Sequence, residues 1–461
     1  MKDDPKVEVI ESTLIFPAEK QNETTVALSI LDATVAHFAP CAAVWYFDAP
    51  SEESGGSNWP SDLQESLRVI LSTFPQFAGD LKKVKHVPGG DHTQRYGRLQ
   101  LTFGAATDPG VGFSIARCPL SLDELVPSPA QRKAPELHCW NLSCSATCFL
   151  SEFPMSPPSV VLGSQNTVPS IIAHPLADAH ALAIFMHRWS YEHSLIFVDA
   201  PTITPSSSFS FSDNSQPPTF NPQLLDACAA GDIDAAFPVD TILEKSRSLP
   251  SSRYDWFWPP PDGDPDQHLP PGLTRSMVIS PGNQMPKADW DRTARVSHTK
   301  LHFSAAHIQR FWEAAGPSVS RHDAILAHVW SAVNRARGLS TDDQDVSLHI
   351  SFGVRRRLGL PSSFMGSPIL NTSVKMAGKD VSGFAARDVA DKIHGTVALY
   401  TEDALKARLH DLCFECAPQR FGRHIWAPDM CYLQAGHIYI CMRLSLEGVT
   451  GNLDTLSLLC R

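Results

Sequence analysis

Residues 169–189 constrain the fold more than any other stretch, because they read as a buried strand, a tight turn and a helix. The apolar run 171–173 predicts the end of a buried strand, and Pro175 prevents that strand from continuing. Asp178 stands where a helix N-cap belongs. The apolar residues that then recur at helical spacing are Leu182, Phe185, Met186 and Trp189. The turn therefore holds His174 and Asp178 at the exit of a strand, where a rigid frame can present an imidazole to a substrate.

The spacing His174-x-x-x-Asp178 is a weak signal when it is considered alone. A chain with 19 histidines shows about one such spacing by chance, and a single histidine before a proline usually has a structural role. His180 and His187 suggest a metal cluster with His174, but their successive spacings of six and seven residues do not share one helix face. A metal site is therefore disfavoured, and the weight of the motif depends on its context.

Length and charge exclude several classes of function. A chain of 461 residues predicts two or three domains, and 43% hydrophobic with 19% charged residues is typical of a globular protein. A net charge of -11 without a basic block argues against nucleic acid or an anionic membrane as partner. The charged N-terminus leads into no apolar segment and no run reaches membrane-spanning length. Eleven scattered cysteines then favour free thiols, and a cytoplasmic monomer is expected.

Alternating and helical patterns predict a mixed α/β fold with two β-rich halves. Residues 199–277 are rich in serine and proline and predict a long surface crossover between the halves. The expected domains are residues 1–200, 201–277 and 278–461. The expected strands are residues 6–16, 25–31, 43–47, 96–103, 137–153, 168–173, 296–303 and 347–352, and the expected helices are 62–74, 178–189, a helix capped by Ser304, 320–338 and 389–409.

Other motifs favour structural roles. Cys413-Phe-Glu-Cys416 lacks the second pair or the βαβ setting that a zinc or redox site needs. The aromatic cluster of residues 254–258 fits a segment pinned onto a domain better than a substrate patch. The sequence has no glycine-rich phosphate loop and no Gly-x-Ser-x-Gly nucleophile elbow, which argues against nucleotide binding and serine hydrolase chemistry.

Several motifs together resemble the BAHD acyl-CoA-dependent acyltransferases. The segment from Asp62 to Leu81, with Phe74-Pro-Gln-Phe-Ala-Gly79, resembles the family's N-terminal signature, and His174-Pro-Leu-Ala-Asp178 matches its HxxxD motif. Residues 320–338 resemble its Asp-Ala-Leu-x-Ala-x-x-Trp helix. The arginine segment and the Phe-Gly-Asn loop of the family are similar to Val354-Arg-Arg-Arg-Leu358 and to Gly366-Ser-Pro-Ile-Leu-Asn371. The motifs occur in family order, and Ala-Pro-Gln near the end is similar to fungal members of secondary metabolism.

The resemblance implies two chloramphenicol-acetyltransferase-like domains with a channel between them. Acyl-CoA as co-substrate and a small-molecule acceptor would enter from opposite faces and meet at His174, and no metal or bound cofactor is implied. His174 would be the general base for a hydroxyl or amine of the acceptor. Asp178 would be structural and pair with Arg355, although Arg356 and Arg357 stay open because the triplet leaves the register undecided.

The sequence departs from the family at two places. Ala179 stands where the family has glycine, which strains the turn if the position needs a positive φ and is harmless if it is helical. The Asp-Phe-Gly-Trp-Gly loop near the family's C-terminus is missing, and Phe421-Gly-Arg423 is a poor substitute. From Trp426 onward the chain no longer resembles the family, so we expect an altered tail that leaves a sheet edge of the second domain unpaired.

The sequence therefore predicts an acyl-CoA-dependent O- or N-acyltransferase. The altered tail predicts a chain that folds in outline with weak or no activity, and the alternative function is a catalytically inactive relative that acts as a binding protein. A condensation-type domain, which uses a similar histidine with carrier-bound thioesters, is a third alternative. It is disfavoured because such domains have a second histidine at the start of the motif, where this chain has Ala173.

Overall fold

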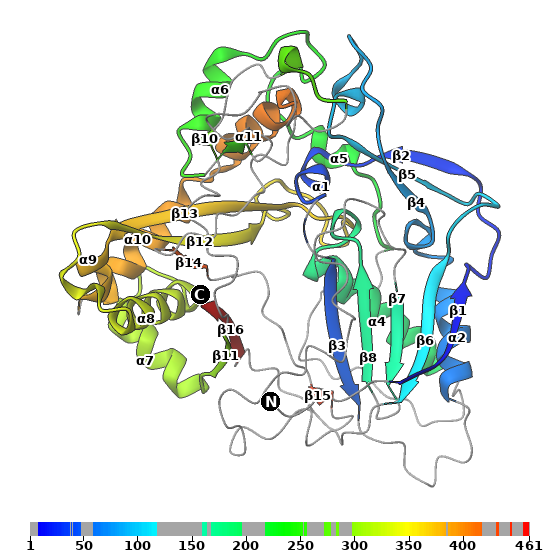
Figure 1. Ribbon diagram of the computed structural model, residues 1–461, viewed down its shortest axis with the longest axis horizontal. Coiled ribbons are helices and arrows are strands. Elements are labelled where there is room, and N and C mark those ends of the chain that lie inside the picture. Colours follow the sequence, from blue (N-terminus) through cyan, green and yellow to red (C-terminus); the bar gives the residue numbers. More distant parts are fainter. Residues whose placement is uncertain are drawn as a thin grey trace, which may run out of the picture.

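The structure is a computed structural model of the chain, shown as a ribbon in Figure 1. It describes residues 8–36, 38, 40–47, 59–117, 159–163, 167–195, 217–251, 253–255, 272–277, 283–284, 297–383, 386–416, 430–432, 443–444 and 455–460. The expected strand at 137–153, with Cys139, Cys144 and Cys148, lies outside these residues, as do Trp256–Trp258 of the aromatic cluster.

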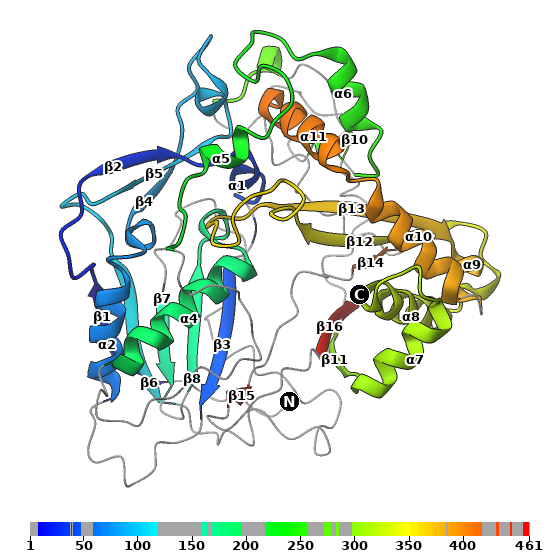
Figure 2. The ribbon, with the colours of Figure 1, turned by 180° about the vertical axis from the view of Figure 1, so that it is seen from behind.

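A six-stranded sheet forms the centre of the first half of the chain. Its strand order is β1-β6-β7-β8-β3-β15. The bounds are β1 Glu8–Ile15, β3 Cys41–Phe47, β6 Val111–Arg117, β7 Ser159–Gly163, β8 Thr167–Ile172 and β15 Arg443–Leu444. Helices α2 (Trp59–Ile70) and α4 (Ala179–Leu195) lie side by side over one face of this sheet, which is seen most clearly in Figure 2. A second, three-stranded sheet has the order β2 (Thr24–Ala27), β5 (Leu99–Phe103), β4 (Asp80–Lys83).

Aromatic packing fixes helix α4 to the first half. The ring of Phe185 meets Phe74 and Phe77 edge to face at 5.3 and 5.2 Å, and the indole nitrogen of Trp189 donates to Ser66 Oγ at 2.9 Å. These side chains are almost fully buried, and such pairs add about 0.5–1.5 kcal/mol each beyond their buried area. The helix that follows the His174 turn is therefore held rigidly at its apolar face.

A five-stranded sheet forms the centre of the second half, in the order β11-β16-β14-β12-β13. The bounds are β11 Ser297–His302, β12 Asp345–Gly353, β13 Ile369–Ala377, β14 Met430–Tyr432 and β16 Thr455–Cys460. Four helices lie beside this sheet: α7 (Ala305–Ala315), α8 (Arg321–Ala336), α9 (Gly378–Ser382) and α10 (Ala386–Ala398). The expected N-caps Ser304 and Ser320 are confirmed, since each forms a capping box with the residue three positions later.

The crossover differs from its prediction where the structure describes it. Instead of a bare surface segment, residues 217–251 form α5 (Gln223–Asp226) and α6 (Asp240–Arg247), and α6 packs on α11 (Glu402–Phe414). Leu225 and Leu249 are buried in a core shared with α1 (Ile30–Thr34) and α11. Farther along, β9 (Tyr254–Asp255) pairs with β10 (Asn283–Gln284). The domain limits at residues 200 and 277 stay a prediction.

Two predicted elements are wrong in their extent. The strand predicted over residues 25–31 ends at Ala27, and α1 begins at Ile30 because Ser29 and Asp32 form a capping box. The helix predicted over residues 389–409 is two helices, α10 and α11, because Thr401 accepts from the amide of Ala404 and starts a new N-terminus.

The C-terminal tail also contradicts its prediction. Instead of leaving an unpaired sheet edge, β14 pairs with β12 over residues 347–349, and β16 pairs with β11 over residues 297–302. The two tail strands pair with each other at Tyr432 and Leu459. The tail thus links β11 to the β12–β13 hairpin and completes the sheet.

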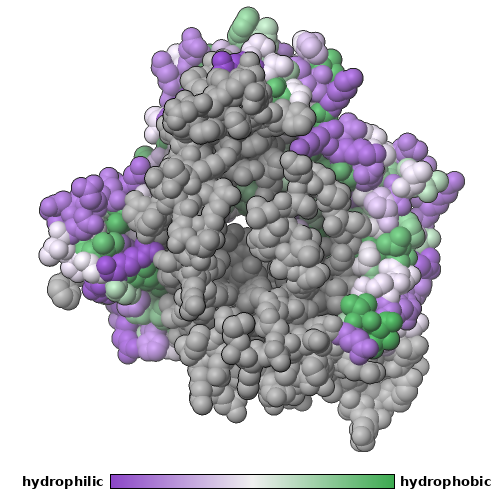
Figure 3. All heavy atoms as spheres, in the orientation of Figure 1, coloured by the Kyte–Doolittle hydropathy of each residue, from purple (hydrophilic) through white to green (hydrophobic). Residues whose placement is uncertain are grey.

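Apolar side chains gather over β1 and α2 on the right of the face in Figure 3. The exposed apolar residues there are Val9, Ile10, Leu14, Phe16 and Val69. β1 is an outer strand of its sheet. Among the described residues, no helix combines the length and apolarity that crossing a bilayer requires.

Ending the chain after Asp454 tests the role of the tail. The truncation removes β16, leaves β11 without its partner and exposes the backbone groups of a strand. We expect a melting temperature lowered by several degrees or an aggregating chain, measured by differential scanning fluorimetry. A truncated chain that unfolds at the wild-type temperature would show that β16 does not support the sheet.

Candidate active site

His174 lies where the sequence predicts, immediately after β8. The strand ends at Ile172, and residues His174–Leu176 form a single 3-10 turn with Pro175 in its first positions. His174 is buried, with 3% of the residue exposed. The Phe38 ring meets the imidazole edge to face, with 5.4 Å between the ring centroids. Burial lowers the pKa of His174, while the nearby charge of Asp178 opposes this shift. The imidazole is therefore neutral near pH 7, as a general base must be.

Asp178 caps helix α4 and also forms a buried ion pair. Its Oδ1 accepts from the amide of Ala181 at 2.9 Å, which confirms the predicted N-cap. Both carboxylate oxygens accept from the guanidinium of Arg355, with Nη2 to Oδ1 at 2.9 Å. Although burial favours the protonated form, the charge and hydrogen bonds of Arg355 outweigh it and lower the pKa of Asp178.

The structure separates the three neighbouring arginines. Arg355 is buried and binds Asp178, whereas Arg356 is exposed. Arg357 donates to the carbonyls of Val397 and Tyr400, at the C-terminal end of α10. The three arginines thus have different surroundings. The one that pairs with Asp178 is Arg355, the first candidate from the resemblance.

Arg355 also holds the loop of residues 363–367. Its Nε donates to the carbonyl of Phe364 at 3.1 Å and its Nη2 to the carbonyl of Gly366 at 3.0 Å. The amide of Asp178 donates to the same Gly366 carbonyl at 3.2 Å. One guanidinium therefore fixes the turn after His174 to a loop from the second half of the chain.

The departure at Ala179 is harmless. Ala179 is the exposed first residue of α4. A helical position does not require the positive φ that glycine allows. The turn keeps its shape without glycine.

Two site residues were not predicted from the sequence, Ser367 and Asp32. Ser367 Oγ lies 2.9 Å from His174 Nδ1, and the amide of Ser367 donates to Asp32 Oδ1 at 2.6 Å. Burial raises the pKa of Asp32 to about 7, against hydrogen bonds from Ser29 and Ser367 that lower it. The Ser29-x-x-Asp32 spacing of a capping box was the available signal, but the alternating pattern around it favoured a strand.

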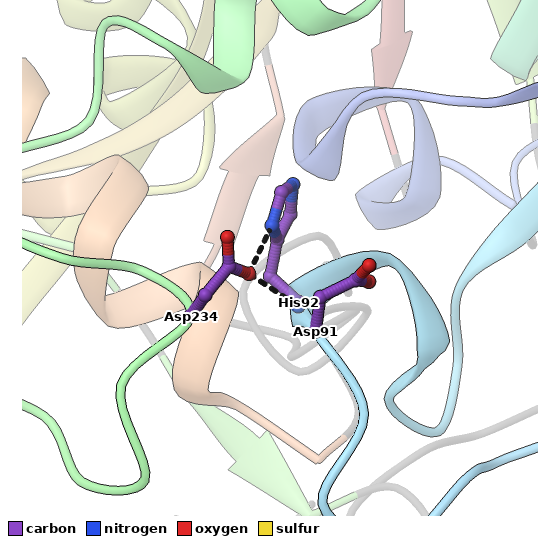
Figure 4. Close-up of side chains that lie close together, drawn as sticks. All are labelled: Asp91, His92 and Asp234. Carbon is purple, nitrogen blue, oxygen red and sulfur yellow. Dashed lines mark hydrogen bonds and ion pairs between the residues drawn. The ribbon is translucent and has the colours of Figure 1, made fainter.

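A second cluster lies outside the His174 site. Among the described residues, one group of side chains is close enough together to hold a metal ion: Asp91, His92 and Asp234 (Figure 4). His92 Nδ1 lies 2.8 Å from Asp234 Oδ1, and its Nε2 lies 3.3 Å from Asp226 Oδ2. Although burial lowers the pKa of His92, the two carboxylates outweigh it and raise the pKa. Both ring nitrogens of His92 already contact carboxylates. His92 therefore links the first half of the chain to Asp226 and Asp234 of the crossover.

The comparisons with known proteins identify the family. A family model described as "Transferase family" matches residues 5–136. An acyltransferase of Alternaria alternata, AFT15-1, is 30% identical over 390 residues, which cover 80% of this chain and 72% of the relative. The acyltransferase abl6 of Leptosphaeria maculans is 28% identical, with 90% and 80% covered. The chain belongs to the BAHD acyltransferases, and the expected likeness to fungal members is confirmed.

Solved structures confirm the predicted fold class. The structure of TRI101 from F. graminearum, complexed with coenzyme A and T-2 mycotoxin, superposes with a TM-score of 0.52 at 10% identity, over 89% of this chain and 83% of that one. At this identity the likeness concerns the fold alone. The architecture is that of an acyltransferase of mixed α/β class.

Substitution of Arg355 by methionine tests the ion pair. Removing one partner leaves the buried carboxylate of Asp178 uncompensated, which costs about 3–5 kcal/mol. We expect that loss in urea unfolding followed by tryptophan fluorescence. Arg356→Met is the matched control, since the neighbouring arginine is exposed and should change the free energy of unfolding by less than about 0.5 kcal/mol. Equal stability of the two variants would contradict the assigned pairing.

Proposed function

We propose that the chain transfers an acyl group from acyl-CoA to a hydroxyl or amine of a small-molecule acceptor, with His174 as general base. The single observation that carries this proposal is the buried imidazole of His174, held at a strand exit beside the Asp178–Arg355 pair. The family supports the acyl-transfer chemistry, and the TRI101 structure, solved with coenzyme A, supports acyl-CoA as the donor. A cytoplasmic monomer with a channel between its halves is part of the same proposal.

The proposed reaction is a direct transfer. Nε2 of His174 takes the proton from the acceptor O–H or N–H as that atom bonds to the thioester carbonyl carbon. The carbon–sulfur bond then breaks, and the imidazolium returns the proton to the departing thiolate, so the products are an ester or amide and free CoA. A base in this position contributes typically about 10²–10⁴-fold. Asp178 and Arg355 keep the turn in place and do not exchange protons in this scheme.

The alternative function is a catalytically inactive binding protein. The missing Asp-Phe-Gly-Trp-Gly loop favours it. The unpaired sheet edge expected from the altered tail does not favour it, because β14 and β16 lie between β11 and β12 in the described sheet. Turnover of acyl-CoA distinguishes the two functions.

Substitution of His174 by alanine tests the base. We expect thiol release from acetyl-CoA, measured against a panel of alcohols and amines, to fall by about 10²–10⁴-fold, because the variant loses the proposed general base. His187→Ala, which removes an imidazole from the following helix, is the matched control and should keep most of the activity. Equal rates for His174→Ala and wild type would remove this histidine from the mechanism, and a wild type without turnover would favour the binding protein.

The pH dependence of the reaction provides a separate test. The base must be unprotonated, and burial lowers the pKa of His174 below its ordinary value of 6.5. We expect kcat/KM to fall to half of its maximum only at a pH below 6.5, because the protonated ring cannot act as the base. A profile that already falls to half its maximum above pH 7 would contradict a base with a lowered pKa.

A further inference from the structure

Ser367 is buried at the back of the imidazole. The residue is 0% exposed, and its hydroxyl oxygen lies 2.9 Å from His174 Nδ1. Among the described residues, His174 is the one hydrogen-bond partner of this hydroxyl. Most buried side-chain hydroxyls have at least one hydrogen-bond partner, and for Ser367 that partner is the His174 ring.

The contact bears on which ring nitrogen carries the proton. A serine hydroxyl can donate to a bare Nδ1 or accept from Nδ1–H, and the 2.9 Å distance fits both arrangements. When Ser367 Oγ accepts, Nδ1 carries the hydrogen. In a neutral imidazole Nε2 then keeps its lone pair. Ser367 Oγ can accept from Nδ1–H in the neutral ring and in the imidazolium alike.

The backbone of Ser367 is fixed from the first half of the chain. Its amide donates to Asp32 Oδ1 at 2.6 Å, and Asp32 Oδ2 accepts from the amide and the hydroxyl of Ser29 at 3.1 and 2.6 Å. Gly366 lets the loop come this close: its φ is 129°, and a Cβ there would lie 3.0 Å from Asp32 Oδ1. Ser367 is therefore held in position by the buried carboxylate of Asp32.

We propose that Ser367 is the positioning residue of the acyl-transfer reaction: its hydroxyl accepts from Nδ1–H of His174 and keeps the lone pair on Nε2, and Asp32 holds the Ser367 backbone in register. This inference rests on the proposed role of His174 as the base. Without the hydroxyl, the ring can rotate or move its proton to Nε2, a form that cannot take the acceptor proton. The outer partners that orient metal-binding histidines change activity by about 10–100-fold, and we expect the same scale here.

The test compares wild type with Ser367→Ala and Ser367→Cys. The cysteine variant nearly keeps the side-chain volume but provides a weak acceptor, so it controls for packing if the alanine variant folds poorly. We expect kcat of both variants to fall by about 10–100-fold, with KM changed by less than about two-fold, because the substituted group acts through the base. Wild-type kcat in both variants would overturn the inference.

Nitrogen-15 NMR of histidine-labelled protein provides a readout that a purely structural role does not move. The His174 signals are assigned by their loss in His174→Gln. We expect the Nδ1–H tautomer in wild type and a mixture of tautomers in both Ser367 variants. An Nε2–H tautomer in wild type, or an unchanged tautomer in the variants, would overturn the inference. If His174 is not the base, His174→Ala keeps full activity. That result differs from the Ser367 results, so a failure of the proposed base can be told apart from a failure of this inference.

Discussion

The guanidinium of Arg355 is the interaction on which the arrangement of the site depends. It binds Asp178, which lies 177 residues earlier in the chain, and the loop at residues 363–367. Burying two charges costs several kcal/mol per ion unless their hydrogen bonds are satisfied. Here both carboxylate oxygens and all three guanidinium nitrogens are bonded within the described residues. A satisfied pair of this kind defines one geometry, because each alternative leaves a buried charge alone.

The loop that Arg355 holds supplies the other contacts of the site. Ser367 reaches the back of His174, Gly366 binds the amide of Asp178, and Met365 is buried in the core of the first half. Asp32, from the short helix α1, fixes this loop at a separation of 335 residues. The site is therefore assembled where both halves meet, and α1 and the crossover share the adjoining core.

The sequence predicts the local features of this site because they follow short-range rules. Pro175 ends the strand, Asp178 caps the helix, and the Ser320 capping box starts α8, each within a few residues of its partner. The resemblance favoured Arg355 as the partner of Asp178 but left Arg356 and Arg357 open, since the choice depends on where each side chain points after folding. Ser367 and Asp32 were missed for the same reason: their contacts with each other and with His174 span long stretches of chain. The prediction that the tail leaves a sheet edge unpaired was wrong because strand pairing is long-range. A tail whose sequence differs from that of its relatives can still form backbone hydrogen bonds with neighbouring strands.

The proposed mechanism depends on acyl transfer at Nε2 of His174, in a site formed by the Asp178 turn and the loop that Arg355 holds. A crystal structure of the chain with coenzyme A bound measures this most directly. We expect the thiol sulfur to lie beside the His174 ring, within about 3 Å of Nε2 or one water away, the reach of a proton transfer, with Ser367 at Nδ1. A coenzyme whose thiol lies elsewhere, with Nε2 enclosed by protein atoms, would contradict it.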